Sequence, residues 1–179
     1  MPRYIAFLRS INVGGRNVKM AELRRSFEGM GFLNVETFIA SGNVIFESGS
    51  KNAKSLEFKI EGELYKALGY ETAVFVRSAD ELKAISKHKL FTKRPEGAGL
   101  YIAFLTEPPS TDAKAKLGSF QTKTDTFHFE GRELYWVCQT RFSDSTFSGP
   151  RLEKVLGMQA TVRNCNTVAK MAAKYGRSN

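Results

Sequence analysis

The 179-residue chain has few of the residues that build common metal and nucleophile sites: two cysteines and two histidines. Cys138 and Cys165 are too few for a disulfide framework and too far apart for a Cys-x-x-Cys site. We therefore expect buried, reduced thiols and a cytoplasmic location. His88 and His128 share no metal-ligand spacing with the cysteines, so we expect no metal and no other cofactor.

Long apolar runs and the standard catalytic motifs are missing as well. The longest uncharged apolar run has only about five residues, so we expect no membrane-spanning helix. No leader-like segment precedes the first predicted strand, which indicates no secretion signal. The sequence contains no G-x-x-x-x-G-K-[ST], G-x-G-x-x-G or G-x-S-x-G motif. Whether the protein is an enzyme stays open at this point.

Positive charge is the clearest excess in the composition. The chain has 27 Lys and Arg against 18 Asp and Glu, a net charge of +9. Up to Pro95 there are 16 basic and 10 acidic residues, and after it 11 and 8, so the surplus is spread along the chain. A charge of this sign favours encounter with phosphates and other anions. Solubility alone explains it equally well.

A repeated pentapeptide divides the chain in two: Tyr4-Ile5-Ala6-Phe7-Leu8 returns unchanged at residues 101–105. The patterns that follow also repeat, because each copy predicts a strand, a helix, a hairpin, a helix, a strand and a trailing helix. We predict an α+β protein of two tandem ferredoxin-like halves (βαββαβ plus a helix), residues 1–95 and 98–179, packed into one unit.

Local signals predict where several elements begin and end. Ser78 and Glu81 form the S-x-x-E pattern of a capping box. Gly69 follows a helix predicted from the apolar stripe between residues 53 and 68, and Pro150 fits the first turn of a helix that Gly157 ends. Inner strands such as residues 4–8 and 73–76 are apolar without alternation, so we expect both faces of each sheet to be buried.

Four polar clusters are candidate sites. Residues 9–16 lead from a strand to a helix, where glycine N–H groups and the helix N-terminus could hold an anion. Residues 41–43 form a hairpin turn, residues 163–167 open the last helix, and residues 141–151 form a loop with two phenylalanines. The ligand-binding candidates are Arg9, Asn12, Gly14, Gly15, Arg16, Ser41, Asn43, Arg163, Asn164 and Asn166. Each cluster also has a purely structural explanation. Residues 9–16 could be a plain strand–helix connection and residues 41–43 a simple turn. Residues 163–167 could serve only to cap a helix, and residues 141–151 could be a surface loop anchored by its aromatic side chains.

RNA-recognition domains share the βαββαβ order, and their third strand carries aromatic residues that stack on bases. In this chain Asn43 and Ile45 stand where those aromatics belong, and Ser41 stands where a basic residue belongs. We therefore expect no standard RNA-recognition platform.

The same stretches resemble an uncharacterised, mainly bacterial family, domain of unknown function 1697. The resemblance lies in residues 4–15, Met20-Ala21-Glu22-Leu23, residues 41–46 and residues 156–168. It implies an α+β protein with ferredoxin-like halves and no assigned reaction or ligand. Ser10, Thr146 and Cys165 depart from the residues common in the family, and no catalytic residue can be carried over.

Three functions remain open. The first is a non-catalytic module that binds a phosphate-bearing or other anionic ligand, with nucleic acid as one such partner. The second is a protein-interaction module that uses exposed strand edges or the loop with Phe142 and Phe147. The third is a small-molecule enzyme with a site between the halves, for which Cys165 is the one nucleophile candidate in the first three clusters.

Overall fold

The protein was analysed as a computed structural model that describes residues 1–9, 11, 17–39 and 42–177. These residues form an α+β protein with two four-stranded antiparallel sheets and six α-helices. None of the helices they form is long and apolar enough to span a membrane. In chain order the elements are β1 (Arg3–Leu8), α1 (Met20–Gly29), β2 (Leu33–Thr37), β3 (Asn43–Glu47), α2 (Ala53–Leu68), β4 (Val74–Ser78), α3 (Ala79–Ser86), η1 (Lys89–Phe91), β5 (Gly99–Leu105), α4 (Thr111–Gly118), β6 (Asp125–Glu130), β7 (Glu133–Cys138), η2 (Phe142–Asp144), α5 (Gly149–Leu156), β8 (Ala160–Asn164) and α6 (Cys165–Tyr175).

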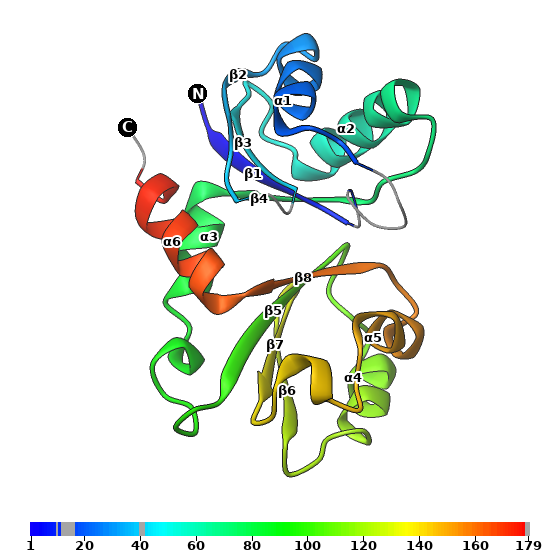
Figure 1. The fold of residues 1–179 in the computed structure, drawn as a ribbon, viewed down its shortest axis with the longest axis vertical. Coiled ribbons are helices and arrows are strands. Elements are labelled where there is room, and N and C mark those ends of the chain that lie inside the picture. The colour runs from blue at the N-terminus through cyan, green and yellow to red at the C-terminus, as the bar shows by residue number, and fades with distance from the viewer. Residues whose placement is uncertain (10, 12–16, 40–41, 178–179) are drawn as a thin grey trace. The chain divides into compact units, whose positions relative to one another are not determined.

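The first compact unit comprises Met1–Lys83 and Met171–Asn179. Its sheet has the strand order β2-β3-β1-β4, with antiparallel neighbours throughout. Helices α1 and α2 lie on one face of this sheet (Figure 1). Side chains such as Phe27, Phe46 and Ile60 fill the core between them. Each of these three bulky apolar side chains is fully buried, which stabilises the fold by about 1.5–3 kcal/mol per side chain.

The second compact unit comprises Ala84–Lys170. Its sheet order, β6-β7-β5-β8, matches that of the first unit strand for strand. Helices α4 and α5 cover one face of the sheet (Figure 1), over a core that contains Trp136, Leu117 and Leu152. The repeated pentapeptide lies in equivalent positions: Tyr4 pairs with Ser78 in the first sheet, and Tyr101 pairs with Asn164 in the second.

The residues that the sequence indicates as the starts and ends of helices are confirmed. The Ser78 backbone N–H donates to the Glu81 carboxylate at 2.7 Å, and the Glu81 N–H donates to Ser78 Oγ at 3.1 Å, which is the capping box that begins α3. Gly69 and Gly157 end α2 and α5 in the left-handed conformation, with φ of +78° and +67°. The unbroken apolar strands are buried on both faces, because neighbours such as Ile5 and Ala6 are both inaccessible to solvent.

Carboxylates of α2 complete the outer edge of the first sheet. β4 is an edge strand, and its outward backbone N–H groups at Val74 and Val76 donate to Glu61 (3.0 Å) and Glu57 (2.9 Å). Glu57 also lies 3.9 Å from Nη1 of the fully buried Arg77. Occupied edge donors cannot pair with another strand, so these two bonds also protect the edge.

The second unit repeats half of this arrangement. Glu153 of α5 accepts a hydrogen bond from the Ala160 N–H of edge strand β8 at 3.1 Å, as Glu61 does from Val74. Four residues earlier, where α2 has Glu57, α5 has Gly149. The carboxylate that faces Arg77 therefore has no counterpart in α5.

Candidate functional site

Two of the predicted clusters meet at one end of the first sheet. The Leu8 N–H donates to the Gly42 carbonyl at 2.8 Å, and Arg9, the next residue, donates its backbone N–H to Ala73 at 2.9 Å. Asn43 pairs with Phe7, and its buried side chain donates to the Phe38 carbonyl at 2.9 Å, so it closes the β2–β3 hairpin. The other candidates of these clusters, Asn12, Gly14, Gly15, Arg16 and Ser41, lie outside the described residues.

Gly42 is the position in this region where a side chain would not fit. Its φ is +75°, and a Cβ atom there would come within 2.9 Å of Ile11 Cγ2. We expect Gly42→Ala to lower the free energy of unfolding by about 1–3 kcal/mol, because it combines backbone strain with overpacking. Urea denaturation followed by circular dichroism would measure the loss. Gly49→Ala is the control, because nothing lies within 4 Å of a Cβ there, and an equal loss in both variants would contradict the prediction.

The third cluster belongs to the second unit. Asn164 Oδ1 accepts the Asn166 N–H at 2.8 Å, so Asn164 caps α6, as the capping alternative predicted. Arg163 Nη1 donates to Thr161 Oγ1 at 2.7 Å and to the Val162 carbonyl at 3.1 Å. Burial lowers the pKa of Arg163 to about 10, so its guanidinium is still charged at neutral pH. The structure thus brings Arg163, Asn164 and Asn166 together at the start of one helix.

The fourth cluster is a surface loop held by its aromatic side chains. Phe147 is buried 5.0 Å from the Phe127 ring, and the Phe142 ring lies 4.2 Å from that of Tyr101. Ser145 Oγ donates to both carboxylate oxygens of Asp125, at 3.0 and 3.1 Å. These contacts show that aromatic side chains anchor the loop.

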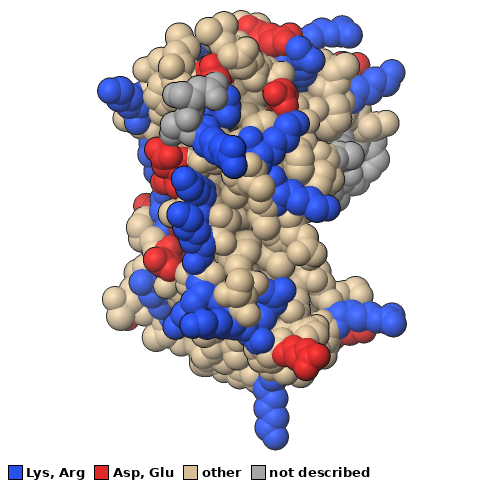
Figure 2. Space-filling model, turned by 90° about the vertical axis from the view of Figure 1, so that its left-hand side faces the viewer, with Lys and Arg blue, Asp and Glu red and all other residues tan. Residues whose placement is uncertain are grey.

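A run of cations without carboxylates begins in the second half of α3 and continues into the segment that leads to β5. Residues 82–95 contain five Lys or Arg and no Asp or Glu, and four of the five fall within the second unit. Lys87, Lys89 and Lys93 are exposed, and none of their ammonium groups bonds to another described side chain. Lys and Arg also gather on the lower part of the face in Figure 2, the side on which this segment lies in Figure 1. The count of Lys and Arg in each half of the sequence does not show this run. The absence of Asp and Glu over fourteen residues is the sequence signal that could have predicted it.

The backbone of this segment is held by its own polar side chains. Arg94 Nε donates to the Ala98 carbonyl at 2.8 Å, and its Nη1 donates to the carbonyls of Leu90 (3.0 Å) and Phe91 (2.7 Å). His88 Nδ1 accepts the Leu90 N–H at 3.2 Å and so caps η1. Arg94 is therefore structural, and the neighbouring lysines extend from a fixed loop.

His88 is held in a second way, by packing on β7 and by a carboxylate of β6. Its ring stacks on Tyr135 at 3.9 Å, and its Nε2 lies 3.2 Å from the exposed carboxylate of Glu130. Burial lowers the pKa of His88, and Glu130 opposes this only in part, so His88 is neutral at pH 7. His128, by contrast, is solvent-exposed on β6.

The described residues offer no metal centre and little nucleophilic chemistry. No group of three or more His, Cys, Asp or Glu among them could hold a metal ion. Cys138 and Cys165 are free and buried, as expected. Cys165 Sγ lies 3.9 Å from Asn166 Oδ1, and no histidine or carboxylate of the described chain forms a hydrogen bond with it.

These features define an α+β protein with two similar four-stranded units and polar surface clusters. The chain belongs to the family described as "Protein of unknown function (DUF1697)", whose pattern matches residues 1–135. A solved structure with a similar fold is that of the conserved bacterial protein SP0830 from Streptococcus pneumoniae, at 24% identity and a TM-score of 0.78 over 99% of both chains. No curated protein matches the sequence. The family has no assigned function, in agreement with the expectation from sequence.

Proposed function

We propose that this protein is a non-catalytic module that binds phosphate-bearing polymers, nucleic acid above all, through Lys87, Lys89 and Lys93 of the second unit. The observation that carries the proposal is the run of exposed lysines on a fixed loop, in a stretch of fourteen residues without an acidic side chain. Each lysine that contacts a phosphate releases condensed counterions, which drives binding at low salt. Because Arg94 and His88 hold the loop, little ordering entropy opposes the contact.

The proposal has a second part, which concerns the architecture. We propose that the chain consists of two tandem ferredoxin-like halves, residues 1–95 and 98–179. The compact units are divided differently, because residues 84–95 belong to the second unit and residues 171–179 to the first. The support is the shared element order, the shared strand order and the equivalent positions of the repeated pentapeptide. Folds of this order have many functions, so the lysines and not the fold carry the functional argument.

Fluorescence anisotropy with labelled single- and double-stranded RNA and DNA, from about 50 to 300 mM salt, would test the proposal. We expect the triple variant Lys87→Gln, Lys89→Gln, Lys93→Gln to reduce the salt dependence of binding. The slope of log affinity against log salt concentration should become less negative by about two to three. At about 0.1 M salt the dissociation constant should rise on the order of 100-fold, because the three lost contacts no longer release counterions.

A charge-matched control separates this site from the general basic character of the protein. Lys116→Gln, Lys123→Gln, Lys154→Gln also removes three exposed lysines from the second unit and leaves the same net charge, 9 − 3 = +6. We expect it to weaken binding much less than the triple variant. Equal weakening would show that no particular site exists, and the absence of binding to all four nucleic acids at low salt would overturn the proposed function.

A further inference from the structure

A polar hollow of about 360 Å³ lies within the first unit, on the sheet face opposite α1 and α2. Its size falls at the lower end of the range for small-molecule sites, about 300–1,000 Å³. Ile45 gives it one apolar wall, and side chains from β1, β2, β3 and the end of α6 complete it. The cations that line it are Arg3 and Lys174, and the carboxylates are Glu36 and Glu47, so the lining has no net charge.

Glu47 is fixed at one side of the hollow. It accepts hydrogen bonds from Asn34 Nδ2 at 2.9 Å and from Arg3 Nη2 at 3.3 Å, and both bonds hold its pKa below the usual range. Asn34 reaches it from a left-handed backbone conformation, φ +48°, beside a β-bulge between Leu33 and Glu36. Bulges and positive φ at a non-glycine residue often aim a side chain at a functional place.

Glu36 is fixed at the other side by the end of α6. Its Oε2 accepts the Tyr175 hydroxyl at 2.8 Å and the Lys174 ammonium at 3.3 Å, and these bonds lower its pKa, the tyrosine bond most. Its Oε1 makes no hydrogen bond with any other residue of the described chain. This oxygen is thus an open acceptor on an ionised carboxylate that is half exposed.

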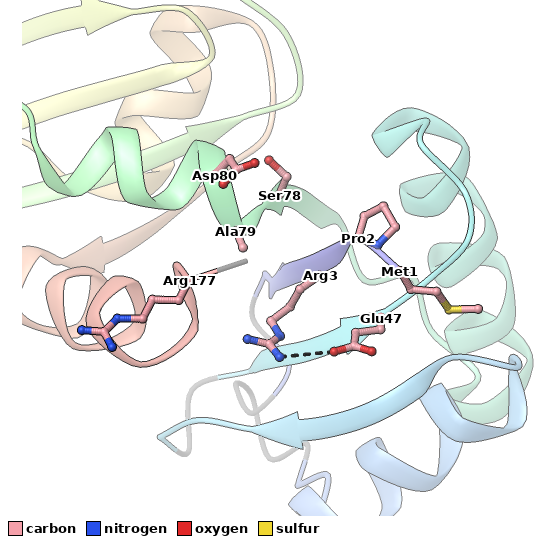
Figure 3. A pocket seen from close by; sticks show the side chains of 8 residues that line it. All are labelled: Met1, Pro2, Arg3, Glu47, Ser78, Ala79, Asp80 and Arg177. Atoms are coloured by element: carbon pink, nitrogen blue, oxygen red, sulfur yellow. Dashed lines mark hydrogen bonds and ion pairs between the residues drawn. The ribbon is translucent and has the colours of Figure 1, made fainter. Parts of the chain in front are cut away.

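Arg3 provides open donors to match. Of its guanidinium nitrogens only Nη2 bonds within the described chain, and its side chain is 22% exposed. The Arg3–Glu47 pair also lies in the wall of a second hollow of about 200 Å³, to which Asp80 and Arg177 contribute (Figure 3). The guanidinium can therefore present its remaining N–H groups to a small anionic group in the polar space around it.

We propose that this hollow binds a small zwitterion of the amino-acid type, with its carboxylate on Arg3 and its ammonium group on Glu36. A purely anionic ligand would be repelled by two fixed carboxylates, and a purely cationic one by Arg3 and Lys174. A neutral molecule with both charges satisfies each open group and disturbs neither fixed pair. This site is separate from the lysines of the second unit, so either proposal can fail alone.

Thermal denaturation of the full chain with each of the free L-amino acids would test the proposal. We expect at least one of them to raise the melting temperature by about 3–6 °C at tenfold excess over its dissociation constant. The amide of that amino acid, which lacks the carboxylate, and its N-acetyl form, which lacks the ammonium group, should each bind at least about tenfold more weakly in calorimetry. No shift with any free amino acid, or equal binding of a blocked form, would overturn the proposal.

Variants then assign the binding to this hollow. Glu36→Gln and Arg3→Gln should each weaken binding of the same amino acid about tenfold or more, whereas Glu28→Gln should not. Glu28 is the matched control, because it is a half-exposed carboxylate of the first unit that pairs with Arg24 at 2.9 Å on α1. Circular dichroism would verify that each variant is folded. If Arg3→Gln does not fold, the result with Glu36→Gln decides the outcome. Unchanged affinity in Glu36→Gln would place the amino acid elsewhere.

Discussion

Replacing Glu57 with alanine should lower the free energy of unfolding by about 3–5 kcal/mol. Arg77 is fully buried, and Glu57 lies 3.9 Å from its guanidinium, so the variant leaves a buried positive charge without this carboxylate. It also removes the acceptor of the Val76 N–H on edge strand β4. Urea denaturation followed by circular dichroism would measure the loss.

Glu61→Ala is the matched control for this prediction. Glu61 lies one turn further along α2 and accepts the Val74 N–H at 3.0 Å, but it is partly exposed. We expect it to lose only about 1 kcal/mol, the net value of one hydrogen bond. The double variant Glu57→Leu, Arg77→Leu should recover much of the stability, because buried ion pairs are often replaced by apolar residues without loss. Equal losses in Glu57→Ala and Glu61→Ala would contradict the role of charge.

The order of helices and strands in each half, and several of their ends, could be predicted from the sequence because the signals for them are local. The capping box joins residues only three positions apart, and the glycines that end α2 and α5 act on the preceding turn. The repeated pentapeptide predicted two similar halves, since equal local sequences form equal strands. In such places neighbours along the chain determine the structure, so a single sequence suffices.

Contacts between distant residues could not be predicted in the same way. The apolar stripe of α2 predicted which face is buried, but nothing in it indicated that Glu57 would reach β4, nineteen positions away. Arg77 is buried inside a strand, where a sequence pattern predicts an apolar residue. The pairs that line the hollow of the first unit are more remote still, because Glu36 meets Tyr175 across 139 positions.

The candidate site shows the same difference between local features, which the sequence indicates, and distant contacts, which it does not. Asn164 could be predicted as a helix cap because the bond to Asn166 is local. The lysines at 87, 89 and 93 could have been predicted from the absence of nearby acids, yet only the structure shows that Arg94 and His88 hold their loop. Local composition therefore indicates where charge accumulates, and tertiary contacts determine whether that charge is presented on a rigid surface.

A second large effect is expected at Asp125, the buried carboxylate of the second unit. It is 2% exposed, and it accepts the indole N–H of the fully buried Trp136 at 2.8 Å and the Ser145 hydroxyl at 3.0 and 3.1 Å. Ser145 Oγ in turn accepts the Phe147 N–H at 3.0 Å. One carboxylate therefore joins the start of β6, the centre of β7 and the loop before α5.

We expect Asp125→Ala to lower the free energy of unfolding by about 2–4 kcal/mol, because the buried Trp136 N–H and the Ser145 hydroxyl lose their acceptor. Trp136 is the single tryptophan of the chain, so its fluorescence during urea denaturation reports on this unit directly. Asp125→Asn keeps an oxygen that can accept the indole N–H and should lose only about 1 kcal/mol. If Asp125→Asn is as unstable as Asp125→Ala, the negative charge and not the hydrogen-bond acceptor stabilises this unit.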